Sequence, residues 1–579
     1  MSEATLKTTL KIYGVAASPG IAIGIARVLK KNKIVSTGIL LNNESDIKNE
    51  IEKFDNAIHS SVNEIERIKN NENLNSNQES QEILETHIEL LTDPQLKIDV
   101  YNEINVNRKN AIDAVIEIIH NIVQVFNKLD NEYLKARAAD VQDIGNRILK
   151  NLGTANNNEH HFLPNTIIIA EDISPTEVLN IDLKEVIGFV TQAGGKTSHT
   201  AILAKSKNIP AVLGCGDPVN IIEEHDLIIV DAANGIIIVN PSDDCIEEYK
   251  IKKTDFDEKR EFLNSLKQTP AQTTDGIKIE LLTNISSTED LEESLDYGAE
   301  GVGLFRTEWL YMNSKTFPTE EEQFEYYRKV ALRSKDKPIT IRTIDIGGDK
   351  PLDYFQLPKE ENPFLGYRGI RICLDRKDIF TTQLKAILRA SVFGRFKIMF
   401  PMISNVHELR LAKEILNDTK DELKENDIEF DLSIPVGIMI EVPSAALMAD
   451  ILAKEVDFFS IGTNDLCQYI LAVDRGNETI KELYNPFDPA VLRLISNVIS
   501  QADQNNISVS ICGEMASDPN ATRLLMGMGL KEFSMSPSSI PIIKNIILNT
   551  SYSQANEVWS NVQRMDNGKS IVNYLQELQ

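Results

Sequence analysis

Eight short apolar runs recur through the last part of this chain, from about Asp275 to Gln579. They are Ile279–Ile285, Gly301–Phe305, Ile339–Ile346, Phe396–Met402, Val436–Ile440, Val456–Ile461, Ile507–Ile511 and Leu530–Met535. Each run has the length of a buried strand, and the chain between consecutive runs is long enough for a helix. Eight such repeats in about 300 residues predict a (β/α)8 TIM barrel. A doubly wound open sheet is the alternative for the same pattern.

Polar side chains stand where most of these predicted strands end, the position at which a barrel gathers its ligand groups. They are Arg306, Arg342, Glu441, Asn464, Asp465, Arg475 and Cys512. Arginine forks suit phosphate and carboxylate oxygens. Two carboxylates on different strands suit Mg²⁺. Taken singly, an arginine here could be a surface ion pair and the cysteine a packing residue. Taken together, they predict a small, multiply anionic, magnesium-bound ligand.

A second informative stretch, Gly194–Thr200, follows the apolar run Val186–Val190. Its two glycines let the chain turn sharply, and Thr197 or Ser198 is a suitable N-cap for the apolar segment behind it. His199 then falls in the first turn of a helix, where free backbone N–H groups favour an anion. Its imidazole could accept a phosphoryl group. The alternative is a histidine that only caps or packs at a helix start.

Changes in composition along the chain predict a multidomain α/β protein. We expect an α/β domain at 1–30 and 153–240, an inserted all-helical domain at 31–152, a helical linker at 241–272 and the barrel at 273–579. The expected strands of the α/β domain are a short pair within 12–24 and the runs 166–170, 186–190, 211–213, 227–231 and 236–239, the last two joined by a hairpin at Asp231–Gly235.

The helical insertion shows four apolar stripes at three- and four-residue spacing, which predict antiparallel helices. The stripes begin at Ile47, Ile83, Ala111 and Leu134. His87 lies in the second stripe, so we interpret it as a core or interface residue and not as a ligand. The segment Leu91–Pro94 is a plausible helix end.

Bulk properties exclude several classes of protein. The net charge of −27 makes nucleic acid an unsuitable partner and could favour a small partner with a basic face. Five cysteines without a CxxC spacing indicate free thiols in a reducing compartment. No apolar run approaches the roughly 18 residues of a membrane span, and the first residues lack a secretory signal. We therefore expect a cytoplasmic protein with no membrane insertion.

The motifs of the chain resemble those of enzyme I of the bacterial phosphoenolpyruvate-dependent sugar phosphotransferase system. The matching segments span nearly the whole chain: 137–145, 194–200 (GGKTSHT), 301–308 (GVGLFRTE), 342–350 (RTIDIGGDK), 437–443 (GIMIEVP), 460–466 (SIGTNDL) and 512–516 (CGEMA).

This resemblance implies a role for each residue. His199 would be phosphorylated at Nε2, and Cys512 would protonate the enolate to give pyruvate. The substrate-binding residues would be Arg306, Arg342, Asn464 and Arg475, and the Mg²⁺ ligands Glu441 and Asp465. The helical domain would bind the phosphocarrier protein HPr, the phosphohistidine domain would carry His199, and the barrel would also form a homodimer.

Small departures from the family pattern leave the reacting groups in place. Lys196 stands where arginine is usual, Ser174 replaces a threonine thought to orient the histidine, and Val442 follows the magnesium glutamate. Because one histidine must serve both phosphoenolpyruvate and HPr, we expect its domain to swing about the linker at 241–272.

Three alternatives are compatible with parts of the pattern. Pyruvate phosphate dikinase and phosphoenolpyruvate synthase share the histidine domain and the barrel but carry a large nucleotide-binding domain. A nitrogen-regulatory enzyme I would add a sensor domain ahead of Ile12. A non-catalytic scaffold would bind HPr without needing the arginines, the carboxylates and Cys512.

Overall fold

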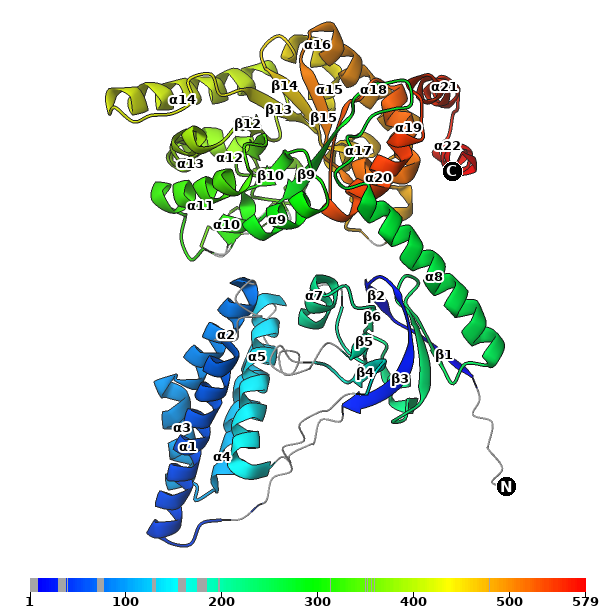
Figure 1. Cartoon of the computed structure of the whole chain (residues 1–579). Coiled ribbons are helices and arrows are strands. Elements are labelled where there is room, and N and C mark those ends of the chain that lie inside the picture. Colours follow the sequence, from blue (N-terminus) through cyan, green and yellow to red (C-terminus); the bar gives the residue numbers. More distant parts are fainter. Residues whose placement is uncertain are drawn as a thin grey trace. The chain divides into compact units, whose positions relative to one another are not determined.

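The computed structural model describes residues 9–29, 38, 40–69, 78–127, 132–154, 163–173, 185–195, 198–312, 314–348, 350, 352, 354–355, 357–358, 360–477 and 479–578. They belong to two compact units, Met1–Lys259 and Arg260–Gln579, which we describe one at a time. The ribbon is drawn in Figure 1. In the described part, no helix combines the length and the apolar character needed to cross a lipid bilayer.

The first unit contains an eight-stranded mixed sheet in the order β1-β8-β7-β3-β4-β5-β6-β2. Its strands are β1 (Leu10–Tyr13), β2 (Val15–Ser18), β3 (Ile21–Leu29), β4 (Thr166–Ala170), β5 (Val186–Thr191), β6 (Ala211–Leu213), β7 (Leu227–Asp231) and β8 (Ile236–Val239). The opening segment therefore supplies three strands where two were expected. The hairpin between β7 and β8 is confirmed, and Asn234 N donates to Asp231 Oδ1 at 3.1 Å in its turn.

The central strands of this sheet are apolar on both sides because both faces are covered. In β4, Ile167 and Ile169 join one apolar cluster, while Ile168 and Ala170 join another. Alternate residues of a strand point to opposite faces, so the continuous apolar run of β4 fills two cores at once.

A helical bundle is inserted between β3 and β4. Its helices are α1 (Glu44–Lys69), α2 (Gln78–Leu91), α3 (Pro94–Asn105), α4 (Ala111–Asn127) and α5 (Glu132–Leu149). Figure 1 shows α1, α3, α4 and α5 side by side. The four apolar stripes did not predict α3. Asp93 both follows α2 and caps α3, accepting a hydrogen bond from Gln95 N at 2.8 Å. His87 is buried in the bundle, 3.8 Å from Asp143, as its place in an apolar stripe predicted.

The expected linker region contains one long helix, α8 (Asp243–Ser265). Its sequence is rich in charged residues, and among its described side chains Tyr249 alone is buried. Such a helix is supported by exposed pairs such as Lys252–Glu248 at 2.6 Å and by its own backbone.

The second unit is a closed barrel of eight parallel strands, which confirms the predicted fold. Neighbours run β9 to β16 in chain order, and β16 pairs with β9 to close the ring. The strands are β9 (Glu280–Ile285), β10 (Val302–Arg306), β11 (Ile339–Arg342), β12 (Phe396–Phe400), β13 (Val436–Ile440), β14 (Phe458–Ile461), β15 (Ser508–Ile511) and β16 (Glu532–Met535). Each lies within or next to one of the eight apolar runs.

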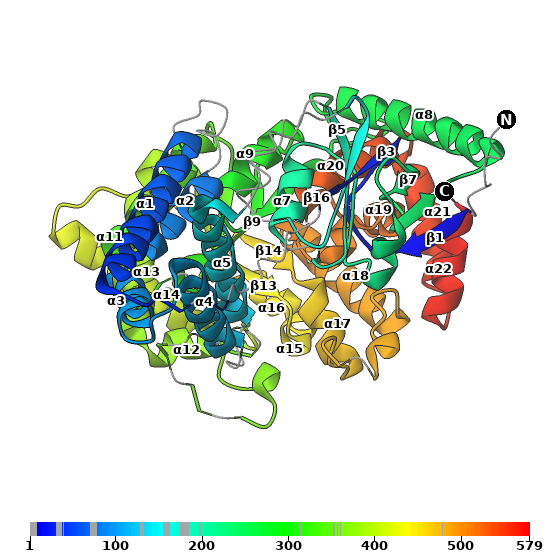
Figure 2. The same ribbon diagram turned by 90° about the horizontal axis from the view of Figure 1, so that it is seen from below.

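Helices surround these strands in Figure 2. They are α9 (Thr288–Asp296), α10 (Glu308–Met312), α11 (Glu320–Arg333), α12 (Ile370–Asp375), α13 (Lys377–Ala390), α14 (Val406–Glu425), α15 (Pro443–Leu447), α16 (Ala449–Leu452), α17 (Thr463–Leu471), α18 (Pro489–Gln504), α19 (Pro519–Gly527), α20 (Ile540–Leu548), α21 (Tyr552–Val562) and α22 (Gly568–Glu577). One large apolar cluster fills the space between helices and strands.

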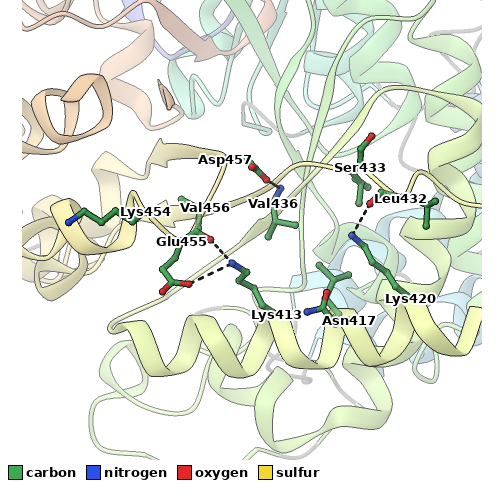
Figure 3. Close-up of a pocket in the computed structure, with 12 residues that line it drawn as sticks. Lys413, Asn417, Lys420, Leu432, Ser433, Val436, Lys454, Glu455, Val456 and Asp457 are labelled. Atoms are coloured by element: carbon green, nitrogen blue, oxygen red, sulfur yellow. Dashed lines mark hydrogen bonds and ion pairs between the residues drawn. The ribbon is translucent and has the colours of Figure 1, made fainter. Parts of the chain in front are cut away.

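A cavity of about 420 Å³ lies at the N-terminal ends of β13 and β14 (Figure 3). It is bordered by α14 and by the residues that precede the two strands. Two lysines that line the cavity donate hydrogen bonds to backbone carbonyl groups. Lys413 Nζ donates to Glu455 O at 2.6 Å, and Lys420 Nζ donates to Leu432 O at 3.5 Å. The cavity is at the end of the barrel opposite to the predicted ligand site.

Candidate active site

His199 begins a helix, as the sequence predicted. Helix α7 spans His199–Ser206, and its N-cap is Ser198, whose hydroxyl accepts a hydrogen bond from Ala201 N at 3.3 Å. The first backbone N–H groups of such a helix favour a negatively charged group nearby. The side chain of His199, together with Lys196 and Ser174, lies outside the described part of the chain.

The other predicted site residues all belong to the second unit and gather at the C-terminal ends of its strands. Arg306 and Arg342 are the last residues of β10 and β11, and Glu441 directly follows β13. Asn464 and Asp465 lie in the first turn of α17, and Cys512 directly follows β15. Because all strands are parallel, these positions share one mouth of the barrel.

Arg342 is held inside this mouth by two carboxylates. Its Nη2 donates to Glu308 Oε1 at 2.7 Å, and its Nη1 lies 3.3 Å from Asp345 Oδ2. Burial acts to lower the pKa of Arg342, but Glu308 and Asp345 outweigh burial and raise it above its ordinary value. Its buried Nε has no hydrogen-bond partner among the described residues. A permanently charged group with an unused donor is therefore available to an anionic ligand.

Gln383 of α13 fixes the backbone that carries the two strand-end arginines. Its Nε2 donates to Thr307 Oγ1 at 3.1 Å, directly after Arg306, and Thr307 Oγ1 donates to Arg342 O at 3.0 Å. The Oε1 atom of Gln383 accepts a hydrogen bond from Ile344 N at 2.8 Å. A side chain thus takes the place of a strand partner beyond Arg342, which explains why β11 ends there although the apolar run continues.

A second buried arginine, Arg368, belongs to the same network, although strand-end reasoning did not identify it. Its Nη2 donates to Asp345 Oδ2 at 3.1 Å and to Asp465 Oδ2 at 3.5 Å, and its Nη1 donates to Tyr469 OH at 3.3 Å. It lies in the connection between β11 and β12, far along the chain from any strand end. The one local signal is the following Gly369, whose φ is +56°.

Glu441 and Asp465 form a pair of buried carboxylates that fits a divalent cation. Burial raises the pKa of Glu441 to about 8, and the charges of Asp465 and Asp345 act in the same direction. Glu441 Oε1 accepts from Met402 N at 2.6 Å, whereas the buried Asp465 Oδ1 has no partner among the described residues. Mutually repelling carboxylates with an unused oxygen are stabilised by a bound cation.

That cation would need ligands from outside the chain. Across the described ranges, no group of three or more histidine, cysteine, aspartate or glutamate side chains is arranged to hold a metal. Mg²⁺ commonly takes one or two carboxylates and completes its shell with water and substrate oxygens. The pair Glu441 and Asp465 matches that requirement.

Cys512 is a buried thiol beside the arginines. It packs in an apolar layer inside the barrel with Leu304, Met399, Met439 and Phe458. Burial raises the pKa of Cys512 to about 11, although Arg342 and Arg306 act to lower it. Its Sγ donates to Ile461 O at 3.6 Å. The group is therefore a protonated thiol near neutral pH and can act as an acid.

The turn after Cys512 also orients Asn464. Asn464 Oδ1 accepts a hydrogen bond from Glu514 N at 3.1 Å, so the NH2 group of this side chain points away from Glu514 N. The turn approaches α17 so closely that a Cβ on Gly513 would collide with the Thr463 hydroxyl. Position 513 therefore requires glycine. Asn464 presents its NH2 group as a hydrogen-bond donor, and a phosphate oxygen needs a donor.

Two further arginines of the predicted set are exposed at the mouth. Arg306 ends β10 at the rim, and desolvation by the surrounding protein, together with the like charge of Arg342, lowers the pKa of Arg306. Arg475 follows α17, and its backbone N donates to Gln468 Oε1 at 3.1 Å. These side chains are accessible to a ligand that enters from solvent, whereas Arg342 and Arg368 form the floor of the site.

Three profiles of PEP-utilising enzymes match successive parts of the chain. The profile described as PEP-utilising enzyme, PEP-binding domain, matches residues 260–552. The profile of the N-terminal domain of PEP-utilising enzymes matches residues 13–137, and that of their mobile domain matches residues 162–235, which include His199.

Full-length relatives carry one common name. The chain is 45% identical to phosphoenolpyruvate-protein phosphotransferase of Buchnera aphidicola subsp. Acyrthosiphon pisum over 98% of this chain and 99% of the relative. It is 44% identical to that of Haemophilus influenzae over 94% of this chain and 95% of the relative. It is 41% identical to the Staphylococcus carnosus protein over 98% of this chain and 99% of the relative. The chain therefore belongs to the phosphoenolpyruvate-protein phosphotransferase family, the enzymes I of the sugar phosphotransferase system.

Proposed function

We propose that this enzyme transfers the phosphoryl group of phosphoenolpyruvate to His199 and then to the active-site histidine of HPr, releasing pyruvate as the first step of sugar uptake. The observation that carries the proposal is the barrel mouth. There the buried Arg342 and Arg368 have unused donors beside a carboxylate pair, and the Cys512 thiol lies close enough to Arg342 to feel its charge. A doubly charged phosphate next to a carboxylate and a carbon to be protonated needs this combination of groups.

In the first half-reaction, the arginines and Asn464 hold the phosphate and carboxylate oxygens of phosphoenolpyruvate. The neutral His199 imidazole attacks phosphorus in line, the bond from phosphorus to the enol oxygen breaks, and an N–P bond forms at Nε2. The released enolate takes the proton of the Cys512 thiol at its terminal carbon and becomes pyruvate. The Cys512 thiolate regains a proton before the next turnover.

Glu441 and Asp465 are the proposed ligands of Mg²⁺. When bound, the ion supplies positive charge that stabilises the phosphate and the developing enolate. Arg368 donates to Asp465 Oδ2 and leaves Oδ1 for the ion. Arg306 and Arg475 complete the substrate site from the solvent side.

In the second half-reaction, the phosphoryl group passes from His199 to HPr. We assign HPr binding to the helical domain at 31–152, the phosphohistidine role to 1–30 and 153–240, and phosphoenolpyruvate binding and homodimerisation to 273–579. The charge of −27 supports a partner with a basic face. The need for a protonated Cys512 supports a reducing, cytoplasmic location. We further propose that the histidine domain moves about the linker at 241–272. Solution scattering of the chain with and without ligand tests this movement.

The transfer is tested with ³²P-labelled phosphoenolpyruvate, Mg²⁺, purified HPr and no nucleotide. The expected label on the chain is labile in acid and stable in base, and it passes to HPr when HPr is added. His199→Ala abolishes both events, whereas His225→Ala, an exposed histidine on another loop of the same unit, leaves them unchanged. A requirement for ATP would contradict the proposal and point to a dikinase or synthase.

A further inference from the structure

The backbone carbonyl of Cys512 is held by a side chain from a strand that is not its neighbour. Asn284 Nδ2 donates to Cys512 O at 3.0 Å. Asn284 belongs to β9, and β16 lies between β9 and the strand that precedes Cys512. The amide therefore reaches across one strand inside the barrel to the residue at the reaction centre.

Ser534 fixes the orientation of that amide. Its hydroxyl donates to Asn284 Oδ1 at 2.6 Å, and its side chain is completely buried. The hydroxyl also lies against Gly303, where a Cβ would collide with it. Because Asn284 Oδ1 accepts from serine, its NH2 group is the donor toward Cys512. We call Asn284 and Ser534 the carbonyl clamp.

The opposite side of the same turn is held by β14 and α17. Cys512 N donates to Ile461 O at 3.1 Å, and the Cys512 thiol donates to the same oxygen at 3.6 Å. Glu514 N donates to Asn464 Oδ1 at 3.1 Å. The peptide groups on both sides of the Cys512 Cα are thus restrained, and the carbonyl clamp restrains the one that faces β9.

We propose that Asn284 and Ser534 are positioning residues that direct the Cys512 thiol at one face of the enolate. The proposal rests on the proposed role of Cys512 as the acid. Rotation of the 512–513 peptide would turn the Cα–Cβ bond and displace the sulfur. Proton transfer needs the donor within hydrogen-bond reach of the carbon, and a displacement of about 1 Å can slow an enzymatic step about 100-fold.

A purely structural role makes a different prediction. If the clamp only satisfies a buried carbonyl, its loss lowers stability and leaves the direction of protonation unchanged. If it positions the acid, its loss slows protonation and lets solvent protonate the released enolate from either face. The face of protonation is therefore the readout that separates the two roles.

The experiment uses (Z)-phosphoenolbutyrate, a methyl-substituted analogue of phosphoenolpyruvate, in D2O with Mg²⁺ and the full-length chain. Addition of deuterium to C3 gives 2-oxobutyrate with a stereocentre, which is trapped by reduction and analysed by NMR. The unaltered chain should place deuterium in one configuration. Asn284→Asp, which sets a carboxylate against the Cys512 carbonyl, should give a mixture and a single-turnover rate lower by about 10- to 100-fold. The KM for phosphoenolpyruvate should stay within about twofold because the arginines are not altered.

Asn497→Asp is the matched control. Asn497 Nδ2 also donates to a backbone carbonyl, Ala446 O, at 3.0 Å, but in the outer layer of helices. It should keep one configuration and the original rate. If Asn284→Asp does not fold, Ser534→Ala decides, because it removes the orienting hydroxyl and leaves Asn284 in place.

Variants of the clamp that match Asn497→Asp in both configuration and rate overturn the positioning role. A mixture from the unaltered chain overturns the role of Cys512 as the acid, and the clamp proposal with it. The two failures are distinguishable because the second appears without any substitution.

Discussion

Arg342 Nη2 lies 2.7 Å from Glu308 Oε1, and their side chains are only 6% and 5% exposed. Glu308 Oε1 also accepts from Asp345 N at 3.1 Å, so one carboxylate holds both a guanidinium and the backbone of the neighbouring turn. A buried charge without its partner is strongly destabilising. Glu308 therefore holds the charged Arg342 side chain in place before any substrate arrives.

Replacement of Glu308 by alanine should destabilise the barrel by about 3–5 kcal/mol, because it leaves the Arg342 guanidinium buried without its closest carboxylate. Urea unfolding followed by tryptophan fluorescence measures this for the barrel unit, since Trp309 and Trp559 both belong to it. The control is Glu325→Ala, which breaks the exposed pair with Arg328 and should cost about 1 kcal/mol or less. Equal losses in the two variants would contradict the assignment.

Cys512 should react slowly with iodoacetamide at pH 7.5. Burial raises its pKa to about 11, so its thiolate fraction is lower by about two orders of magnitude than that of an ordinary cysteine. Because the raised pKa preserves the acid form, Cys512 should cause no loss of activity as the pH rises from 6 to 9. Peptide mapping of the alkylated chain tests the first point, with the partly exposed Cys245 as the internal reference. Early labelling of Cys512 would show that it is a thiolate and not an acid.

Glu441→Gln and Asp465→Asn should each weaken Mg²⁺ binding by at least about tenfold, because each removes one of two charged ligands. Calorimetric titration of MgCl2 in the presence of oxalate, a stable analogue of the enolate, measures the affinity. Asp457→Asn serves as the comparison. Its carboxylate accepts from Val436 N at 2.7 Å at the other end of the barrel, and its loss should leave Mg²⁺ affinity unchanged. Full affinity in either ligand variant would place the ion elsewhere.

Asp345→Asn should change the acid stability of the barrel. Burial acts to raise the pKa of Asp345, but Arg342, Lys350 and Arg368 outweigh it and hold the pKa well below its usual range. A depressed pKa stabilises the fold above the unfolded value of about 3.9, and this contribution is lost as the pH falls toward the folded value. The unfolding free energies of the two proteins should therefore differ most near pH 7 and converge between about pH 4 and 2.

The comparison for this pH series is Asp378→Asn, which removes an exposed pair with Arg376 at 2.7 Å. Its effect should be small at every pH because solvent screens the pair. A difference between Asp345→Asn and the unaltered chain that stays constant down to pH 2 would contradict the ion-pair account.

The barrel could be predicted from sequence because its signal repeats eight times. Each buried strand is a short apolar run, and polar residues follow it at the end where a parallel barrel gathers its ligands. Helix α3 was missed for the opposite reason. It is short, and only Leu96, Val100 and Ile104 of its residues are buried, so its apolar stripe is weak.

The site residues that sequence reasoning missed share one property, which is that their partners are distant in the chain. Arg368 reaches Asp465 across 97 positions, and Asn284 reaches Cys512 across 228. Glu308 was visible in a motif, but its ion pair with Arg342 depends on how β10 and β11 align. Spacing along a strand predicts which side chains point into a barrel, whereas contacts between strands require the register.

The most direct test of the central claim is a single-turnover mixing of the chain with a slight excess of ³²P-labelled phosphoenolpyruvate and Mg²⁺, in the absence of any nucleotide. Label on the chain and free pyruvate are counted from the same quenched samples. We predict a burst of about one label and one pyruvate per chain, formed with the same time course, and neither in His199→Ala. Pyruvate formed without label, or label that appears only when ATP is added, would contradict transfer from phosphoenolpyruvate to His199.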